Sequence, residues 1–172
     1  MTNPRNTPPL LPEETLHRVV RVANIDGLSV MLIAGVLALA AAASGDYHGA
    51  AIGLLVAAAG AIELHGAGLV RAGDRRGMQW LVASQPYLLA VLLGYCVLRL
   101  ANFDLSLLRA ALTDEMRETI RQAGYTVDAF LRLVYRLTYL TLAFTTVIYQ
   151  GGMTIYYLRR RGAVEAALEG TE

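Results

Sequence analysis

Residues Gly49 to Arg71 read GAAIGLLVAAAGAIELHGAGLVR, and this stretch decides how the rest of the chain is interpreted. Before its last arginine it contains only two ionisable side chains, those of Glu63 and His65. A helix rises about 1.5 Å per residue, so a run of this length crosses a hydrocarbon layer roughly 30 Å thick. The stretch therefore predicts a membrane-spanning helix at about 49–70.

Small residues recur at helical spacing along this helix. Gly49, Gly53 and Gly60 follow one another at intervals of four and seven residues, and Glu63 falls on the same face. Because lipid provides no hydrophobic drive for helix association, small residues that allow close backbone approach indicate a helix–helix contact. A carboxylate facing lipid is costly, so we expect Glu63 to point into the protein. His65 lies about 200° further round the helix and shares no small ligand with Glu63 unless another helix contributes.

Three further apolar stretches are long enough to cross a membrane. The predicted spans are residues 27–43, 49–70, 80–98 and 137–158. Gly35 gives the first span a small-residue stripe of its own, and only a short polar turn separates this span from the second. We therefore expect these two spans to pack as an antiparallel hairpin. An alternative is that the first span is a cleaved signal sequence, because Ala41, Ala42 and Ala43 resemble a cleavage site.

The two ends of the chain are polar. Residues 1–11 predict a disordered tail, since they are rich in proline and asparagine. Pro12 then marks the start of a short amphipathic helix, which we expect to lie on the membrane surface before the first span. Residues 162–172 predict an exposed tail that is polar or forms a short helix.

The connection between the third and fourth spans is also charged. Residues 101–125 carry apolar side chains at helical spacing opposite charged ones, which predicts one or two amphipathic helices. Asp104 and Thr113 are suited to cap their N-termini, and Gly124 is suited to end the second. The pattern leaves open whether this connection caps the helical bundle or lies on lipid.

The composition excludes several classes of function. The chain has 172 residues, 55% of them hydrophobic, and a net charge of +1. This size suits one membrane domain at 12–161, and the near-neutral charge argues against nucleic acid as a partner. The single cysteine, Cys96, has no disulfide partner. We expect no cofactor and no metal, because haem needs axial ligands from two helices, and Glu63 with His65 supplies too few ligands for zinc.

We expect no enzymatic activity. An enzyme needs a nucleophile with a base, or paired carboxylates, near the membrane surface. Asp26, before the first span, and Asp74, in the second loop, are the available carboxylates, and both are interpreted as boundary charges.

The positions of the arginines predict the orientation. Four spans place both termini on the same side of the membrane, and the first turn on the other side has no arginine. The arginines on the side of the termini are Arg5, Arg18, Arg21, Arg71, Arg75, Arg76, Arg159, Arg160 and Arg161. The positive-inside rule therefore places both termini in the cytoplasm, and we expect the inner membrane of a bacterium as the location.

The expected aromatic belts comprise Tyr47, Tyr125, Tyr135 and Tyr139 at one boundary and Trp80, Tyr156 and Tyr157 at the other.

Polar side chains from three spans fall at a similar depth when residues are counted inward from the cytoplasmic ends. The candidate intramembrane polar residues are Glu63, His65, Gln85, Tyr87, Tyr149 and Gln150. As a functional site, a carboxylate held by amides and phenols could carry a proton or bind a cation. As a packing contact, a hydrogen-bonded Glu63 would hold the helices in register. The two differ in water access, because a site opens to at least one side whereas a packing contact is dry.

The sequence thus predicts an all-α, four-helix transmembrane bundle with an N-terminal surface helix and an amphipathic connection between the third and fourth spans. The leading function is a non-enzymatic membrane module, structural or partner-binding, that associates with itself or with a larger membrane complex. The glycines expected at helix contacts are Gly35, Gly49, Gly53 and Gly60. The alternative is a small proton- or cation-coupled channel or transporter centred on Glu63.

Overall fold

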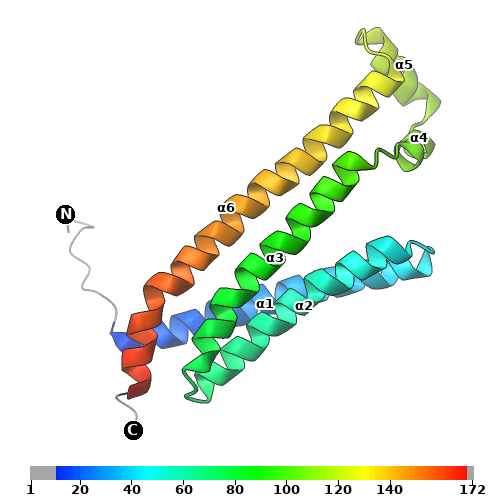
Figure 1. The fold of residues 1–172 in the computed structure, drawn as a ribbon. Helices are drawn as coiled ribbons and strands as arrows, with labels where there is room; N and C mark the ends of the chain where they lie inside the picture. The colour runs from blue at the N-terminus through cyan, green and yellow to red at the C-terminus, as the bar shows by residue number, and fades with distance from the viewer. Residues whose placement is uncertain (1–10, 170–172) are drawn as a thin grey trace, which may run out of the picture. The chain divides into compact units, whose positions relative to one another are not determined.

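The computed structural model describes residues 11–169, and it is all-α, with 89% helix and no strand in that range. The helices are α1 (Pro12–Ala43), α2 (Tyr47–Arg71), α3 (Arg76–Ala101), α4 (Ser106–Ala111), α5 (Asp114–Gln122) and α6 (Val127–Glu169) (Figure 1). Four of them, α1, α2, α3 and α6, are long and apolar enough to cross a membrane, which confirms that part of the prediction. The expected disordered tail lies outside the described residues except for Leu11, which precedes α1.

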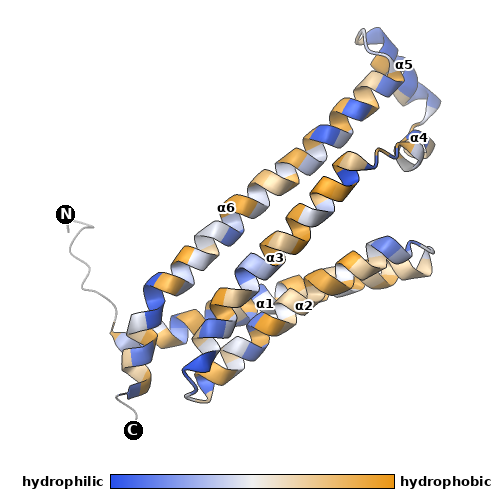
Figure 2. Ribbon diagram, in the orientation of Figure 1, coloured by the Kyte–Doolittle hydropathy of each residue, from blue (hydrophilic) through white to orange (hydrophobic). Residues whose placement is uncertain are grey.

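The described residues form two compact units. Unit 1 comprises residues 11–88 and 150–169, and therefore contains α1, α2, the first half of α3 and the last part of α6. Unit 2 comprises residues 89–149, with the second half of α3, α4, α5 and the first part of α6. Figure 2 shows hydrophobic residues along α1 and α2, whereas α5 is mostly hydrophilic.

The separate surface helix predicted before the first span is absent, because α1 runs unbroken from Pro12 to Ala43. The polar side chain of Asn24 is satisfied within the helix, since its amide donates to the carbonyl of Val20 at 2.7 Å. Gly27, predicted to begin the span, is buried in the middle of the helix. The buried face continues across the predicted break and consists of Thr15, Val19, Val20, Ala23, Gly27, Ala34 and Ala38. Continuous packing along this face therefore favours one helix over two.

Glycines bring α1 and α2 into backbone contact. A Cβ added at Gly60 would lie 2.5 Å from the carbonyl oxygen of Gly27, and one added at Gly53 would lie 2.8 Å from the Cβ of Ala38. Asp46 caps α2 by accepting a hydrogen bond from the backbone of Gly49 at 2.9 Å. The two helices form the expected antiparallel hairpin (Figure 1).

Two glycines predicted at helix contacts do not make them. A Cβ at Gly35 would meet nothing within 4 Å, and one at Gly49 would meet only the Asp46 carboxylate that caps the same helix. Gly27, which was not singled out, takes their place opposite Gly60. The spacing of glycines identifies a face, but the crossing point of two helices selects which glycines are used.

A second glycine contact joins α2 to the start of α3. A Cβ at Gly77 would lie 2.6 Å from the carbonyl oxygen of Gly66, and Gly73 turns the chain between the two helices with a φ of +86°. Only a residue without a side chain adopts that φ readily. α3 then continues through Pro86 without interruption. The buried core of unit 1 consists of Val19, Val20, Ala23, Ala67, Val70, Met78, Leu81, Tyr157 and Val164.

Residues 162–169 are helical, which the prediction allowed, but they are not the exposed tail that was predicted. α6 continues to Glu169, and Val164 is fully buried in the core of unit 1. Arg75 of the second loop pairs with Glu169 at 3.0 Å. Apolar residues at helical spacing after Gly162, Val164 and Leu168 among them, explain why the helix extends beyond the three arginines.

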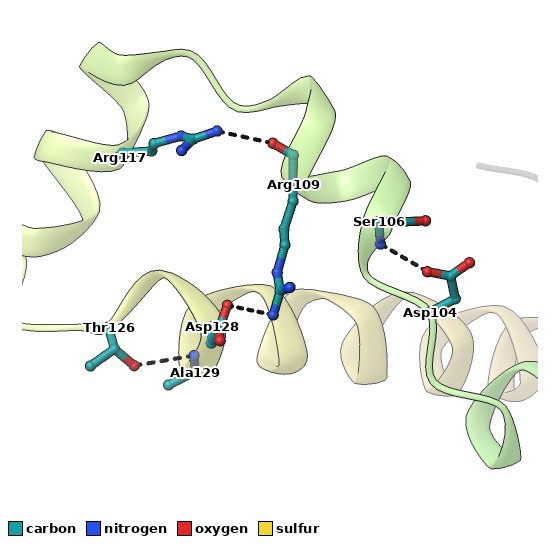
Figure 3. A network of polar contacts seen from close by, with 7 residues as sticks. All are labelled: Asp104, Ser106, Arg109, Arg117, Thr126, Asp128 and Ala129. Carbon is teal, nitrogen blue, oxygen red and sulfur yellow. Dashed lines mark hydrogen bonds and ion pairs between the residues drawn. The ribbon is translucent and has the colours of Figure 1, made fainter.

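Unit 2 contains the two short helices predicted in the charged connection. Thr113 caps α5 by accepting from the backbone of Met116 at 3.3 Å, and Gly124 follows α5 with a φ of +83°. Asp104 accepts from the backbone of Ser106 at 2.9 Å (Figure 3), but Leu105 holds the N-cap position of α4 and makes no side-chain capping hydrogen bond. The predicted cap therefore lies one residue before the observed N-cap position. A small core of Leu105, Leu131 and Tyr135 lies beneath these helices.

Candidate functional site

The candidate site is in unit 1 and is centred on Glu63 of α2. This side chain is only 2% exposed, and its carboxylate accepts a hydrogen bond from the hydroxyl of Tyr157 on α6. Ala59, Gly60 and Ala67, which share its face, are also buried. Their small size allows neighbouring helices to approach closely enough to enclose the carboxylate.

Tyr157 is the residue that the sequence analysis misplaced. It was assigned to an aromatic belt at the membrane boundary, but it is fully buried in the core of unit 1. A buried phenol needs a hydrogen-bond acceptor, and Glu63 provides one. Tyr157 shares a helical face with Val164, and this periodicity is the only signal in the sequence that indicates an inward position.

Asp26 of α1 is a second carboxylate at this site. It is half-buried and lies close enough to Glu63 to interact with it electrostatically. The next residue, Gly27, lies against α2, where an added Cβ would be 3.3 Å from the Cβ of Glu63. The interpretation of Asp26 as a charge at the boundary of the first span is therefore wrong. The reason is that α1 runs from Pro12 to Ala43 without a break, so Asp26 lies within the helix.

Gln85 of α3 is the third polar group near Glu63. Its side chain is 1% exposed and interacts with the Glu63 carboxylate. Its amide nitrogen lies 3.3 Å from the hydroxyl of Ser84, which in turn donates to the carbonyl of Leu81 at 2.9 Å. Within the described residues, the Gln85 carbonyl oxygen has no hydrogen-bond partner. Three helices, α1, α3 and α6, thus contribute polar groups around the buried carboxylate of α2.

The other predicted site residues lie in different surroundings. His65 is exposed and packs edge-on against Trp80, with 5.4 Å between the ring centres. Gln150 is buried, and its side-chain oxygen has no hydrogen-bond partner among residues 11–169. Tyr87 is half-buried in unit 1, whereas Tyr149 belongs to unit 2 and is 48% exposed. Of the predicted set, the structure therefore brings only Gln85 to Glu63.

The donor set limits the chemistry of the site. No group of three His, Cys, Asp or Glu side chains that could hold a metal ion occurs among residues 11–169. The nearby groups are oxygen donors and one amide, which suit a shared proton or a hydrogen-bonded contact between helices. The Glu63 carboxylate is enclosed, and one oxygen of the half-buried Asp26 carboxylate beside it is buried as well.

No known protein family, curated protein or solved structure matches this chain. The function of this chain is therefore inferred from its helices and from the contacts within each unit.

Proposed function

We propose that the chain is a non-enzymatic integral membrane protein that acts as a structural or partner-binding module. α1, α2, α3 and α6 cross the bilayer, and both termini lie in the cytoplasm. The four apolar helices and the arginines near the termini support this arrangement. The inner membrane of a bacterium is the expected location.

One observation supports a packing role for Glu63 and the polar side chains around it. The Glu63 carboxylate is almost completely buried and is hydrogen-bonded to Tyr157 across two apolar helices. A polar contact inside apolar surroundings has few alternative partners, so it favours one register of α2 against α6. The enclosure of Glu63 supports this packing role over a site that is open to water.

Cysteine labelling tests the proposed topology. In a Cys96→Ala background, Ser44→Cys places a thiol in the first turn and Ala72→Cys places one in the second loop. A membrane-impermeant maleimide is expected to label Ser44→Cys in intact spheroplasts, and Ala72→Cys only after permeabilisation. The reverse pattern would invert the orientation. Labelling of both in intact cells, or release of the protein by alkaline carbonate, would contradict a membrane-spanning hairpin.

A second candidate function is proton- or cation-coupled transport centred on Glu63. The proximity of Asp26 favours it, because two carboxylates side by side in an apolar interior are stable only with a proton or a cation between them.

Flux into liposomes separates the two functions. Purified protein is compared with Glu63→Gln and Asp26→Asn, each checked for folding by circular dichroism. The packing role predicts no pH-driven proton or cation flux in any of the three proteins and a lower unfolding temperature for Glu63→Gln. Flux in the original protein that is lost in a folded Glu63→Gln variant would replace the packing role by transport.

A further inference from the structure

Unit 2 contains a pocket of about 490 Å³ beside the turn before α4 and the first turns of α6. Its lining includes Phe103, Asp104, Leu105, Arg109, Arg132 and Arg136. Three guanidinium groups thus line one pocket, although they come from distant parts of the connection and the helix. No step of the proposed packing role uses them.

The arginines are held differently. Arg109 reaches from α4 to the start of α6, where it pairs with Asp128 at 2.9 Å (Figure 3). Arg132 and Arg136 lie one turn apart on α6 and are exposed, and neither belongs to an ion pair of residues 11–169. Two guanidinium groups one turn apart provide parallel N–H donors, which suit a phosphate or carboxylate group.

The wall of the pocket is ordered by aromatic contacts. The Phe103 ring lies 4.6 Å from that of Tyr135, and the guanidinium carbon of Arg136 lies 5.7 Å from the Phe103 ring centre. The Tyr135 hydroxyl donates to the carbonyl of Arg99 at 2.9 Å. These contacts fix the direction of Arg136 before any ligand binds, which reduces the entropy lost on binding.

The carboxylates near the pocket do not neutralise its three arginines. Hydrogen bonds from the side chain and backbone of Ser106 hold the pKa of Asp104 below its ordinary value, so Asp104 is ionised at neutral pH. Asp104 and Asp128 together offset two of the three arginines. Arg117 adds a further positive charge beside the pocket, where its guanidinium donates to the carbonyl of Arg109 at 3.3 Å. The excess of positive charge suits either a phosphodiester, with one negative charge, or a phosphate monoester, with up to two.

The pocket adjoins an apolar stripe. The apolar part of α6 begins directly after Arg136, and Leu140 and Phe144 follow it at intervals of four residues. These two side chains are 56% and 68% exposed. In the membrane orientation proposed above, Arg132 and Arg136 therefore lie at headgroup level, and the stripe extends along the acyl chains.

We propose that Arg109, Arg132 and Arg136 form a phosphate-binding site, and that its ligand is the phosphodiester headgroup of a membrane phospholipid or a soluble phosphate ester. The lipid source rests on the proposed membrane function, whereas the phosphate chemistry does not. The adjoining stripe favours the lipid. This would be a specific lipid site on the side of the bilayer opposite the termini.

The test uses the full chain in detergent. Native mass spectrometry measures the binding of dioctanoyl phosphatidylglycerol, of dioctanoylglycerol, which lacks the phosphate, and of glycerol 3-phosphate. We expect phosphatidylglycerol to bind and dioctanoylglycerol not to bind. The double variant Arg132→Gln/Arg136→Gln should bind phosphatidylglycerol about 30-fold more weakly, as expected for the loss of two cationic contacts near a phosphate.

Two control variants keep the test independent of folding and of net charge. Arg18→Gln/Arg121→Gln removes the same charge from exposed positions outside the pocket and should bind like the original protein. Arg132→Lys/Arg136→Lys keeps the charge but loses the paired donors, and should bind with intermediate affinity. Circular dichroism and unfolding temperature show whether each variant is folded.

Each outcome decides the proposal. Binding of both phosphate compounds with equal affinity would support the phosphate site and assign it to a soluble ester. Binding of dioctanoylglycerol equal to that of phosphatidylglycerol, or an equal loss in both double glutamine variants, would overturn it. Carbonate extraction of the same variants reports membrane insertion separately, so a failure of the membrane proposal is distinguishable from a failure of the phosphate site.

Discussion

The two units hold a carboxylate in opposite ways. In unit 1, Glu63 is enclosed and accepts a hydrogen bond from the buried Tyr157. In unit 2, Asp128 pairs with Arg109, and the two side chains are 56% and 54% exposed. A buried carboxylate that loses its donor keeps its cost of desolvation, whereas an exposed one exchanges its partner for water. The same chemistry therefore contributes much to the fold in one unit and little in the other.

The helices of unit 1 are also packed more tightly at their glycines than those of unit 2. Unit 1 joins helices backbone to backbone at Gly60 and at Gly77, where no added atom fits. In unit 2, an added Cβ at Gly94 would meet nothing within 4 Å, and aromatic rings such as Phe103 and Tyr135 make the close contacts. Rings can shift more easily than backbone, so added volume should be tolerated better in unit 2.

The largest expected effect is that of Gly60→Val, which tests the close contact of unit 1. The new Cβ would lie 2.5 Å from the Gly27 oxygen and 2.7 Å from the Met31 nitrogen, and both are backbone atoms that cannot rotate away. We expect a loss of about 3 kcal/mol in the free energy of unfolding, measured by denaturant titration in detergent. Gly68→Val is the matched control, because a Cβ there meets nothing within 4 Å. Equal losses in the two variants would disprove the close contact.

Tyr157→Phe tests how much the hydrogen bond to the buried Glu63 carboxylate stabilises unit 1. It removes the donor to Glu63 with little change in volume, and we expect a loss of about 2 kcal/mol in the free energy of unfolding. The neighbouring Tyr156→Phe is the control, because its buried hydroxyl has no hydrogen-bond partner in the described part of the chain. That variant should be neutral or slightly more stable. An equal loss of unfolding free energy in Tyr156→Phe and Tyr157→Phe would show that the hydrogen bond to Glu63 does not stabilise unit 1.

Arg109→Gln tests the exposed ion pair with Asp128 in unit 2. It should have the smallest effect on the free energy of unfolding. Since both partners are more than half exposed, we expect a loss of about 0.5 kcal/mol in the free energy of unfolding, which declines as salt is added. Asp128→Asn should give a similar value. A loss as large as that of Tyr157→Phe would mean that the exposed pair is as important to unit 2 as the buried hydrogen bond is to unit 1.

Part of the candidate site was predictable from local patterns. Glu63 shares a face with small residues, and the cost of placing a carboxylate in lipid predicts that this face turns inward. Asp26 was not recognised because the chain was expected to turn into the membrane just after it. No single residue near Asp26 forbids or requires a break, and the buried face that continues through Gly27, which lies against α2, favours one continuous helix.

The sequence by itself determined the helical class, the four long apolar helices, the cap at Thr113 and the inward direction of Glu63. These features depend on periodicity, length and local hydrogen bonds, which act over a few residues. Tertiary structure alone decided that Gly27 rather than Gly35 meets α2, and that Tyr157 reaches Glu63. It also brought Arg109 of α4 beside the arginines of α6. The physical reason is that helix crossing points and partners from distant segments depend on how whole faces pack, and that information is spread over the chain.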